Sequence, residues 1–165
     1  MNREITLGMW NQLRLIHGVT LRAIHKIPAD KLDACPVPGL KSVKELVMHI
    51  YEYAPAMTGA VLKGKLEQTD LPGGKDKVKT VADLEKWCRD RFDEGDANVH
   101  KLTDAQVQAM VPTFFGPTMP GFALISVIYD EHLHHRGQFY AYLRLLGVEP
   151  PFIWGFGENE PAFKP

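Results

Sequence analysis

Three histidines and two carboxylates gather in one short stretch of the chain, Asp130-Glu-His-Leu-His-His-Arg-Gly-Gln138. Polar groups in the middle of an otherwise apolar helix are costly unless a partner satisfies them. Glu131 and His135 are four residues apart, so on a helix they lie one turn apart on the same face. A carboxylate oxygen and an imidazole nitrogen in this arrangement can bind one divalent cation, and zinc, nickel, iron and manganese all suit these donors.

A third ligand has to come from another helix, and His49 is the best candidate. This histidine borders the apolar stripe of a second helical segment, so it can face the inside of a bundle of helices. A cation bound by His49, Glu131 and His135 keeps open coordination positions for water or a substrate thiolate. Open positions are the property of a catalytic site and not of a closed structural one.

Each of these residues also has a structural interpretation. A histidine at the border of an apolar stripe is commonly a core or surface residue with satisfied hydrogen bonds, which applies to His49 taken alone. Glu131 could equally pair with Arg136 or with a histidine. His134 lies about 100° around the helix from His135, so it is expected to face solvent or cap a neighbour. The other histidines lack partners at ligand spacing and are expected to be solvated: His17, His25 and His100.

Four long helices are expected to position these groups. Apolar residues recur three or four apart in four segments, which run from Ile5 to Ile24, from Val43 to Val61, from Val81 to about Leu102, and from Phe122 to Leu146. No internal repeat, β-hairpin signal or GxGxxG phosphate loop is visible in the sequence. The pattern therefore predicts an all-α bundle with two long connections between helices.

Local signals mark the ends and weak points of these helices. Pro55 is expected to kink the second helix or leave local carbonyls unpaired, and Gly95 is a weak point within the third. Gly147 is the expected glycine after the last helix. Two pairs have the form of capping boxes at the starts of the second and third helices: Ser42 with Glu45, and Thr80 with Asp83.

Three further segments are assigned from composition. Residues Thr103 to Gln108 are expected to form a short helical turn, and Val111 to Gly121, with three prolines and two glycines, is expected to be a loop. The tail from Gly147 to Pro165 is rich in proline and glycine but also contains four aromatic residues. Such a tail is expected to pack over the bundle or over a neighbouring subunit. The aromatic residues are Phe152, Trp154, Phe156 and Phe163.

Length and charge limit the class of protein. The chain of 165 residues, 45% of them hydrophobic, has the size of a single globular domain covering residues 1–165. Its 19 basic and 20 acidic residues are interspersed, which argues against nucleic acid or an anionic membrane as a partner. No signal peptide and no apolar run of about 20 residues is found, so we expect a cytoplasmic protein. Cys35 and Cys88 are then expected to stay reduced.

Two stretches of this sequence carry a resemblance to a known family. The residues His134-His-Arg-Gly-Gln138, followed by Phe139-Tyr-Ala-Tyr-Leu-Arg-Leu-Leu-Gly147 and Pro150-Pro151, resemble the end of the fourth helix in the DinB/YfiT-like superfamily. Ser42-Val-Lys-Glu-Leu-Val-Met-His49-Ile50 is similar to the second helix of that family. The resemblance implies an up-up-down-down four-helix bundle, commonly a homodimer. It also implies a divalent metal held by a histidine of helix two and an H-x-x-x-H pair of helix four.

The family pattern carries over to this sequence with one departure. The helix-two ligand falls on His49 and the second histidine of the pair falls on His135, but the first falls on Glu131. Glu131 can bind the metal itself, which keeps the i, i+4 geometry and is the favoured interpretation. Alternatively, His132 can pair with His135 at i, i+3. A third outcome is a degenerate, empty site in which Glu131 is hydrogen-bonded to the histidines.

The resemblance also implies a class of activity. Members of the family include thiol-dependent transferases and isomerases that use mycothiol, bacillithiol or glutathione, so a low-molecular-weight thiol is an expected second cofactor. We expect a metal-dependent hydrolase or thiol transferase whose cation activates a bound water or thiol. His132 or His134 would carry protons, and Arg136 or Gln138 would support the ligands. The alternative is a non-catalytic dimeric bundle of the same fold.

Overall fold

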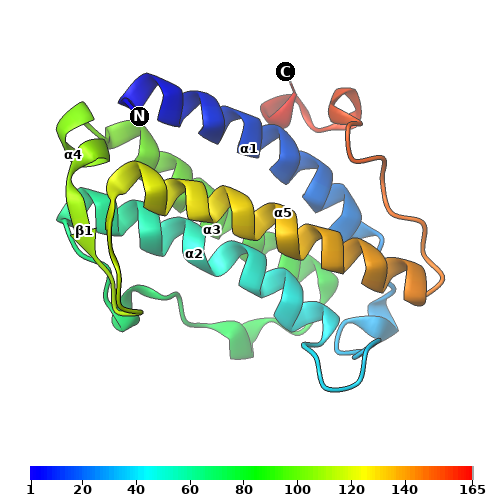
Figure 1. The fold of residues 1–165 in the computed structure, drawn as a ribbon. Helices are drawn as coiled ribbons and strands as arrows, with labels where there is room; N and C mark the ends of the chain where they lie inside the picture. The colour runs from blue at the N-terminus through cyan, green and yellow to red at the C-terminus, as the bar shows by residue number, and fades with distance from the viewer. Residues whose placement is uncertain (165) are drawn as a thin grey trace.

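A computed structural model describes residues 1–164, and most of them lie in helices. Four long helices lie side by side (Figure 1): α1 (Arg3–His25), α2 (Val43–Lys63), α3 (Val81–Lys101) and α5 (Gly121–Leu145). Between α3 and α5 come the short helix α4 (Asp104–Gln108) and two strands, β1 (Met110–Pro112) and β2 (Thr118–Pro120). Short 3-10 turns occupy Ala29–Lys31, Gln68–Asp70, Lys75–Lys77, Phe156–Glu158 and Pro161–Phe163.

The predicted capping boxes start α2 and α3. The Ser42 hydroxyl accepts a hydrogen bond from the Glu45 amide at 3.2 Å, and the Glu45 carboxylate accepts one from the Ser42 amide at 2.8 Å. The same reciprocal pair joins Thr80 and Asp83. These bonds satisfy amides that would otherwise lack partners at a helix start. Pro55 lies inside α2 and does not end the helix.

Helices α2 and α3 run in parallel and approach each other closely. The Asn98 side-chain amide donates to the Thr58 hydroxyl at 3.3 Å, and one turn earlier Gly95 faces Ala54. A Cβ atom at Gly95 would lie 3.2 Å from the Ala54 backbone, so the missing side chain lets the two helices touch. Gly95 therefore serves helix packing, in addition to being a position of low helix propensity.

The directions of the helices correct one expectation. Helices α1 and α5 run one way, and α2 and α3 run the other way (Figure 1), which gives an up, down, down, up order in place of the expected up-up-down-down. The connection 26–42 folds back locally through hydrogen bonds from the Val43 amide to Ala34 and from the Lys44 amide to Leu32, so α2 returns antiparallel to α1. The segment 64–80 then runs the length of the helices and brings α3 parallel to α2.

The segment expected to be a loop between α4 and α5 forms a short antiparallel hairpin. Strands β1 and β2 pair Val111 with Met119, and the Val111 side chain is fully buried. Pro112 and Pro120 lie at strand ends, where a missing amide donor is tolerated. In the sequence, prolines at these positions indicate a loop. The two strands were not predicted for this reason.

The C-terminal tail folds back over α1. The buried Asn159 side chain donates to backbone carbonyls of α1 and of Phe163 at 2.9 and 2.8 Å. This contact requires Gly18, because a Cβ there would lie 2.5 Å from the Asn159 amide nitrogen. The packing expected for the tail is confirmed at Phe163, which is buried, whereas Phe152 and Trp154 are exposed.

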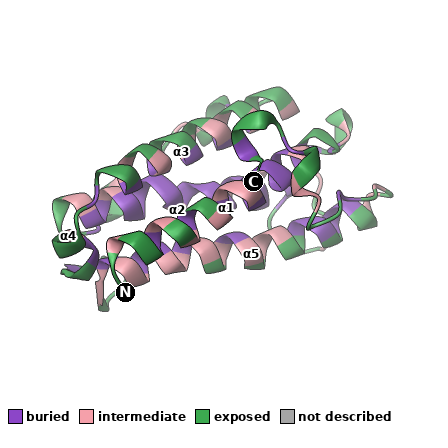
Figure 2. Cartoon of the chain, turned by 90° about the horizontal axis from the view of Figure 1, so that it is seen from above, coloured by how far each residue is buried: buried purple, intermediate pink, exposed green. Residues whose placement is uncertain are grey.

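The hydrophobic core lies between the long helices, with α2 at its centre. Figure 2 shows buried positions over most of α2, while α1, α3 and α5 each keep an exposed outer face. Helix α2 is buried because it packs against both α3 and α5. Within residues 1–164, no helix combines the length and the apolar character that crossing a membrane would require.

Candidate metal centre

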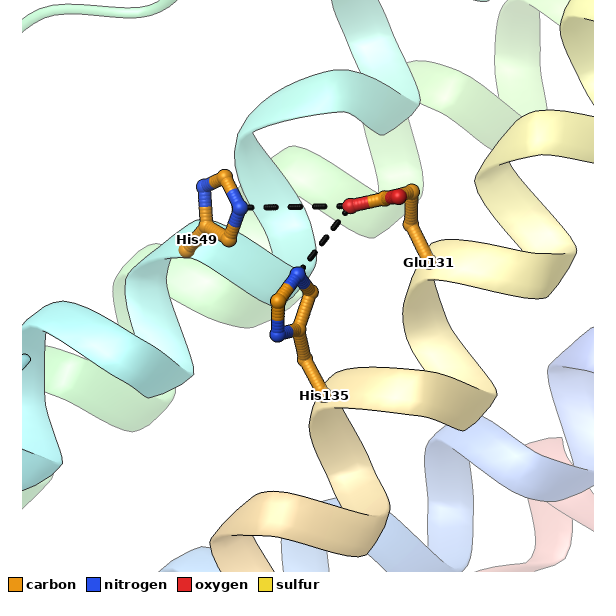
Figure 3. Close-up of side chains that lie close together, drawn as sticks. All are labelled: His49, Glu131 and His135. Atoms are coloured by element: carbon orange, nitrogen blue, oxygen red, sulfur yellow. Dashed lines mark hydrogen bonds and ion pairs between the residues drawn. The ribbon is translucent and has the colours of Figure 1, made fainter. Parts of the chain in front are cut away.

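His49 of α2 and Glu131 and His135 of α5 point toward one another where these antiparallel helices meet (Figure 3). One donor atom from each side chain lies within 4.8 Å of the other two. Glu131 Oε2 is 3.9 Å from His49 Nε2 and 3.1 Å from His135 Nε2. The structure therefore brings together the three residues that the sequence predicts as ligands.

The positions of these side chains follow from helix geometry. Glu131 and His135 are one turn apart on α5, so both face the neighbouring helix α2. All three residues are half-buried, at the edge of the contact between α2 and α5 and not in its middle. Side chains at such an edge can meet each other and still be reached from solvent.

His135 is oriented by a residue one turn further along α5. Its Nδ1 lies 2.8 Å from Gln138 Oε1, while the Gln138 amide nitrogen lies 3.1 Å from His134. A carbonyl oxygen can only accept, so Nδ1 of His135 carries the proton in this assignment. In the neutral ring, Nε2 then carries no proton, and its lone pair is directed at Glu131.

His49 is oriented in the same way, by Glu52. The Glu52 carboxylate accepts from His49 Nδ1 and also pairs with Lys75. Burial opposes ionisation of Glu52, but the hydrogen bonds from His49 and Lys75 outweigh it and lower the pKa of the carboxyl. Glu52 is therefore ionised near neutral pH and accepts the Nδ1 proton, so in the neutral ring the lone pair of His49 lies on Nε2, which faces Glu131.

When both neutral rings carry their proton on Nδ1, two imidazole lone pairs face the Glu131 carboxylate; with the proton on Nε2, His135 instead donates to Glu131 at 3.1 Å. In the first case these three acceptors repel unless a positive charge lies between them, and that charge is either a second proton on a histidine or a metal cation. Metal bonds of about 2.0–2.2 Å allow donor atoms up to roughly 4.2 Å apart, and both distances from Glu131 fall within this limit. The donor set fits a divalent cation.

A cleft of about 760 Å³ adjoins the centre. His49, His135 and Gln138 form part of its wall, and the rest comes from the first half of α2, the preceding loop, the turn at Lys75 and Tyr142 of α5. A molecule bound in the cleft would therefore lie next to the ligand atoms. Ligand sites in proteins are commonly concave, with a few polar groups on one wall, as here.

His132, the predicted alternative to Glu131, lies on another side of α5. Its ring is buried, and its Nε2 is 2.9 Å from the Thr20 hydroxyl. That hydroxyl donates its proton to the Ile16 carbonyl, so the His132 nitrogen donates to it and has no lone pair free there. Burial and the nearby Arg136 charge lower the pKa of His132 to about 3. His132 does not join the His49, Glu131 and His135 group.

The remaining predicted residues divide between the surface and the core. His134 is exposed, and Arg136 stacks over the Tyr140 ring and makes no ion pair with Glu131. His25 and His100 are exposed beside acidic residues of α3. The expectation that His17 is solvated is wrong, because its ring is fully buried against Phe92 at 4.0 Å between centroids.

Sequence reasoning did not find Glu52 and Lys75. The spacing of His49 and Glu52, three apart on one helix, was a usable signal because such a pair shares a helix face. Lys75 carried no signal, since it comes from the long connection 64–80 and reaches Glu52 only in the folded chain.

Fold and site together define a helical protein with a candidate two-histidine, one-carboxylate metal centre. The family model described as the DinB family matches residues 1–162. An uncharacterised protein, YjoA of Bacillus subtilis strain 168, is 26% identical over 138 residues, which cover 82% of this chain and 87% of that protein. The chain belongs to the DinB family.

Solved structures show the same fold. The DinB-like protein YjoA from Bacillus subtilis superposes with a TM-score of 0.74 at 22% identity, covering 88% of this chain and 96% of that one. A DinB-like protein from Bacillus cereus ATCC 10987 gives a TM-score of 0.70 at 20% identity, covering 89% and 96%. At this identity the likeness concerns the fold alone.

Proposed function

We propose that this protein is a metal-dependent enzyme built on a four-helix bundle of the DinB type, with a divalent cation held by His49, Glu131 and His135. The observation that carries the proposal is the convergence of one ligand atom each from His49, Glu131 and His135 within 4.8 Å, while the opposite ring nitrogens of the two histidines are hydrogen-bonded to Glu52 and Gln138. This is the arrangement in which metal-binding histidines are usually held.

The cation would lower the pKa of a bound water or thiol and so supply a nucleophile near neutral pH. The residues of this chain would orient the metal ligands and admit the substrate. Glu52 and Gln138 fix the ring orientation of His49 and His135. The cleft would admit a substrate to a position next to the metal ligands. Two imidazoles and one carboxylate suit zinc, nickel, iron and manganese, and three ligands leave a position open.

The class of reaction belongs to the same proposal. A hydrolase would use the bound water, and a thiol-dependent transferase would use a low-molecular-weight thiol as its second cofactor. Measurements of p-nitrophenyl acetate hydrolysis and of glutathione addition to an electrophile, with and without added metal, separate the two. We expect one of these rates to require metal and to be lost in His135→Ala.

A metal titration by calorimetry tests the centre directly. We expect the protein to bind one divalent cation per chain, and we expect His135→Ala and Glu131→Ala to reduce the affinity by a hundredfold or more, roughly 2.7 kcal/mol. The control is His100→Ala, which alters an exposed histidine of α3 and should bind metal normally. Unchanged stoichiometry and affinity in both ligand variants would remove the proposal. The non-catalytic alternative predicts no binding at these residues in any variant.

The proposal also includes a cytoplasmic homodimer. The exposed aromatic residues Phe152 and Trp154 of the tail support a contact with a second chain, because large apolar side chains on a surface commonly mark interfaces. Equilibrium sedimentation should show twice the chain mass of 18.6 kDa. A single species at 18.6 kDa would contradict the dimer and would leave the metal centre unaffected.

A further inference from the structure

The cleft beside the candidate metal centre has a chemical character of its own. One wall carries His49, His135 and Gln138. The lining also includes residues from the loop and first turn at the start of α2: Gly39, Leu40, Lys41, Lys44 and Glu45. A molecule of moderate size can therefore touch the start of α2 and the metal ligands at the same time.

The charges on this cleft favour an anion. Three lysines line it: Lys41, Lys44 and Lys75. Its two carboxylates are already engaged, because Glu45 accepts from the Ser42 amide at 2.8 Å and Glu52 holds His49 and Lys75.

Two of the lysines are available to a ligand. Within residues 1–164, Lys41 makes no ion pair, and its side chain is exposed. Lys44 pairs with Asp33, but the Asp33 side chain is 71% exposed, and ion pairs with so exposed a partner contribute little. An anion in the cleft could compete with Asp33 for Lys44 without leaving a buried charge unpaired. Lys75 differs, because its partner Glu52 is buried.

Apolar residues also line the cleft. They are Leu46, Met48 and Tyr142, together with Leu40, which is exposed. A ligand that matches this lining has a negatively charged end, a short apolar body and a second end at the metal ligands.

We propose that the cleft binds small amphipathic acids, with Lys41 and Lys44 holding the carboxylate or phosphoryl end. The assignment of the other end as the reacting end rests on the proposed function, whereas the anion site itself does not. The substrate class of the enzyme is then an anionic small molecule, and the two lysines determine specificity.

The test uses the metal-free protein and NMR titration of backbone amides. Succinate is the carboxylate probe, inorganic phosphate is the phosphoryl probe, and 1,4-butanediol is the uncharged analogue of succinate. We expect one of the two anions to shift the amides of residues 39–49 in a saturable and salt-sensitive way, since added salt screens the attraction. The diol should produce no saturable shift. Whichever anion binds more tightly identifies the end group.

Matched variants locate the site. The double variant Lys41→Gln, Lys44→Gln should weaken anion binding by roughly tenfold, because charge-assisted contacts are lost without loss of side-chain length. The control is Lys101→Gln, an exposed lysine at the far end of α3, which should bind as the unaltered protein does. Equal binding by the double variant and the control, or saturable shifts confined to other residues, would overturn the proposal.

The two proposals fail separately. If His135→Ala binds metal like the unaltered protein, the proposed metal centre is wrong, but anion binding by the metal-free protein stands. If neither anion binds at residues 39–49, the proposed anion site is wrong, and the result of the metal titration is unaffected. Adding metal to the protein with bound anion completes the test, since a ligand that spans the cleft should bind more tightly when the cation is present.

Discussion

Two clusters of histidines occupy neighbouring sides of α5, and they differ in what their ring nitrogens face. In the core cluster, His132 donates to Thr20 and His17 Nδ1 lies 2.8 Å from the Tyr51 hydroxyl. Both rings are buried. In the candidate metal centre, His49 and His135 direct ring nitrogens at a carboxylate and border a cleft.

The comparison shows how partners decide the role of a histidine. A hydroxyl can donate or accept, so it can satisfy a neutral ring in the core without any added charge. A carboxylate can only accept, so two neutral rings protonated on Nδ1 need a positive charge between them and Glu131. Burial adds to the contrast, because it keeps the core rings neutral, whereas the half-buried site can admit a cation from solvent.

The largest expected difference between the clusters is in stability. His132→Ala should lower the free energy of unfolding by about 3 kcal/mol, because it opens a cavity and removes the partner of the Thr20 hydroxyl. His135→Ala, at the half-buried site, should cost less than about 1 kcal/mol. Urea unfolding of the two metal-free variants measures both values. Equal losses of unfolding free energy in the two variants would contradict the proposed difference between the two clusters.

The next effect concerns metal and stability together. Free metal at about a hundred times its dissociation constant should raise the free energy of unfolding by about 2.7 kcal/mol, because only the folded chain presents the complete site. Thermal melts with and without metal should show this gain in the unaltered protein and in His100→Ala. No gain should remain in His135→Ala. A gain that survives in His135→Ala would place the cation elsewhere.

The contribution of Gln138 to the orientation of His135 should be measurable as a change in metal affinity. Gln138→Ala removes the acceptor that orients His135, so metal affinity should fall by about ten- to a hundredfold while stability changes little. Gln108→Ala, at the exposed last residue of α4, provides the control. An unchanged dissociation constant in Gln138→Ala would show that the ring is held by packing alone.

The clusters should also differ in the pH dependence of stability that the core cluster contributes. Burial, with the nearby His132, lowers the pKa of His17 well below its ordinary value of 6.5, so below that pH the unfolded chain binds a proton that the folded chain does not. Stability should then fall with decreasing pH, with a slope approaching about 1.4 kcal/mol per pH unit for this ring. His132, whose pKa is about 3, should add a similar slope between pH 6 and pH 4.

Urea unfolding between pH 7 and pH 4.5 measures this slope. His17→Gln should show a shallower pH dependence than the unaltered protein, because one buried titrating ring has been removed. His100→Gln, which alters an exposed histidine, should keep the full slope. An identical slope in all three proteins would exclude His17 as its source.

Much of the local structure could be predicted from the sequence. The capping boxes at Ser42 and Thr80 start helices where expected, since a cap depends only on residues within one turn. Glu131 and His135 share a face for the same local reason. The Val111 to Gly121 segment was predicted wrongly, because its prolines lie at strand ends that only the pairing of the two strands defines.

The sequence by itself determined four helices and the donor types that they carry, because helix periodicity and capping act over a few residues. Tertiary structure decided which way α2 and α3 run, that His17 is buried, and that Lys75 reaches Glu52. These features depend on the path of long connections and on contacts between distant segments. The candidate metal centre needed both: local spacing placed Glu131 beside His135, and the antiparallel packing of α2 against α5 brought His49 to them.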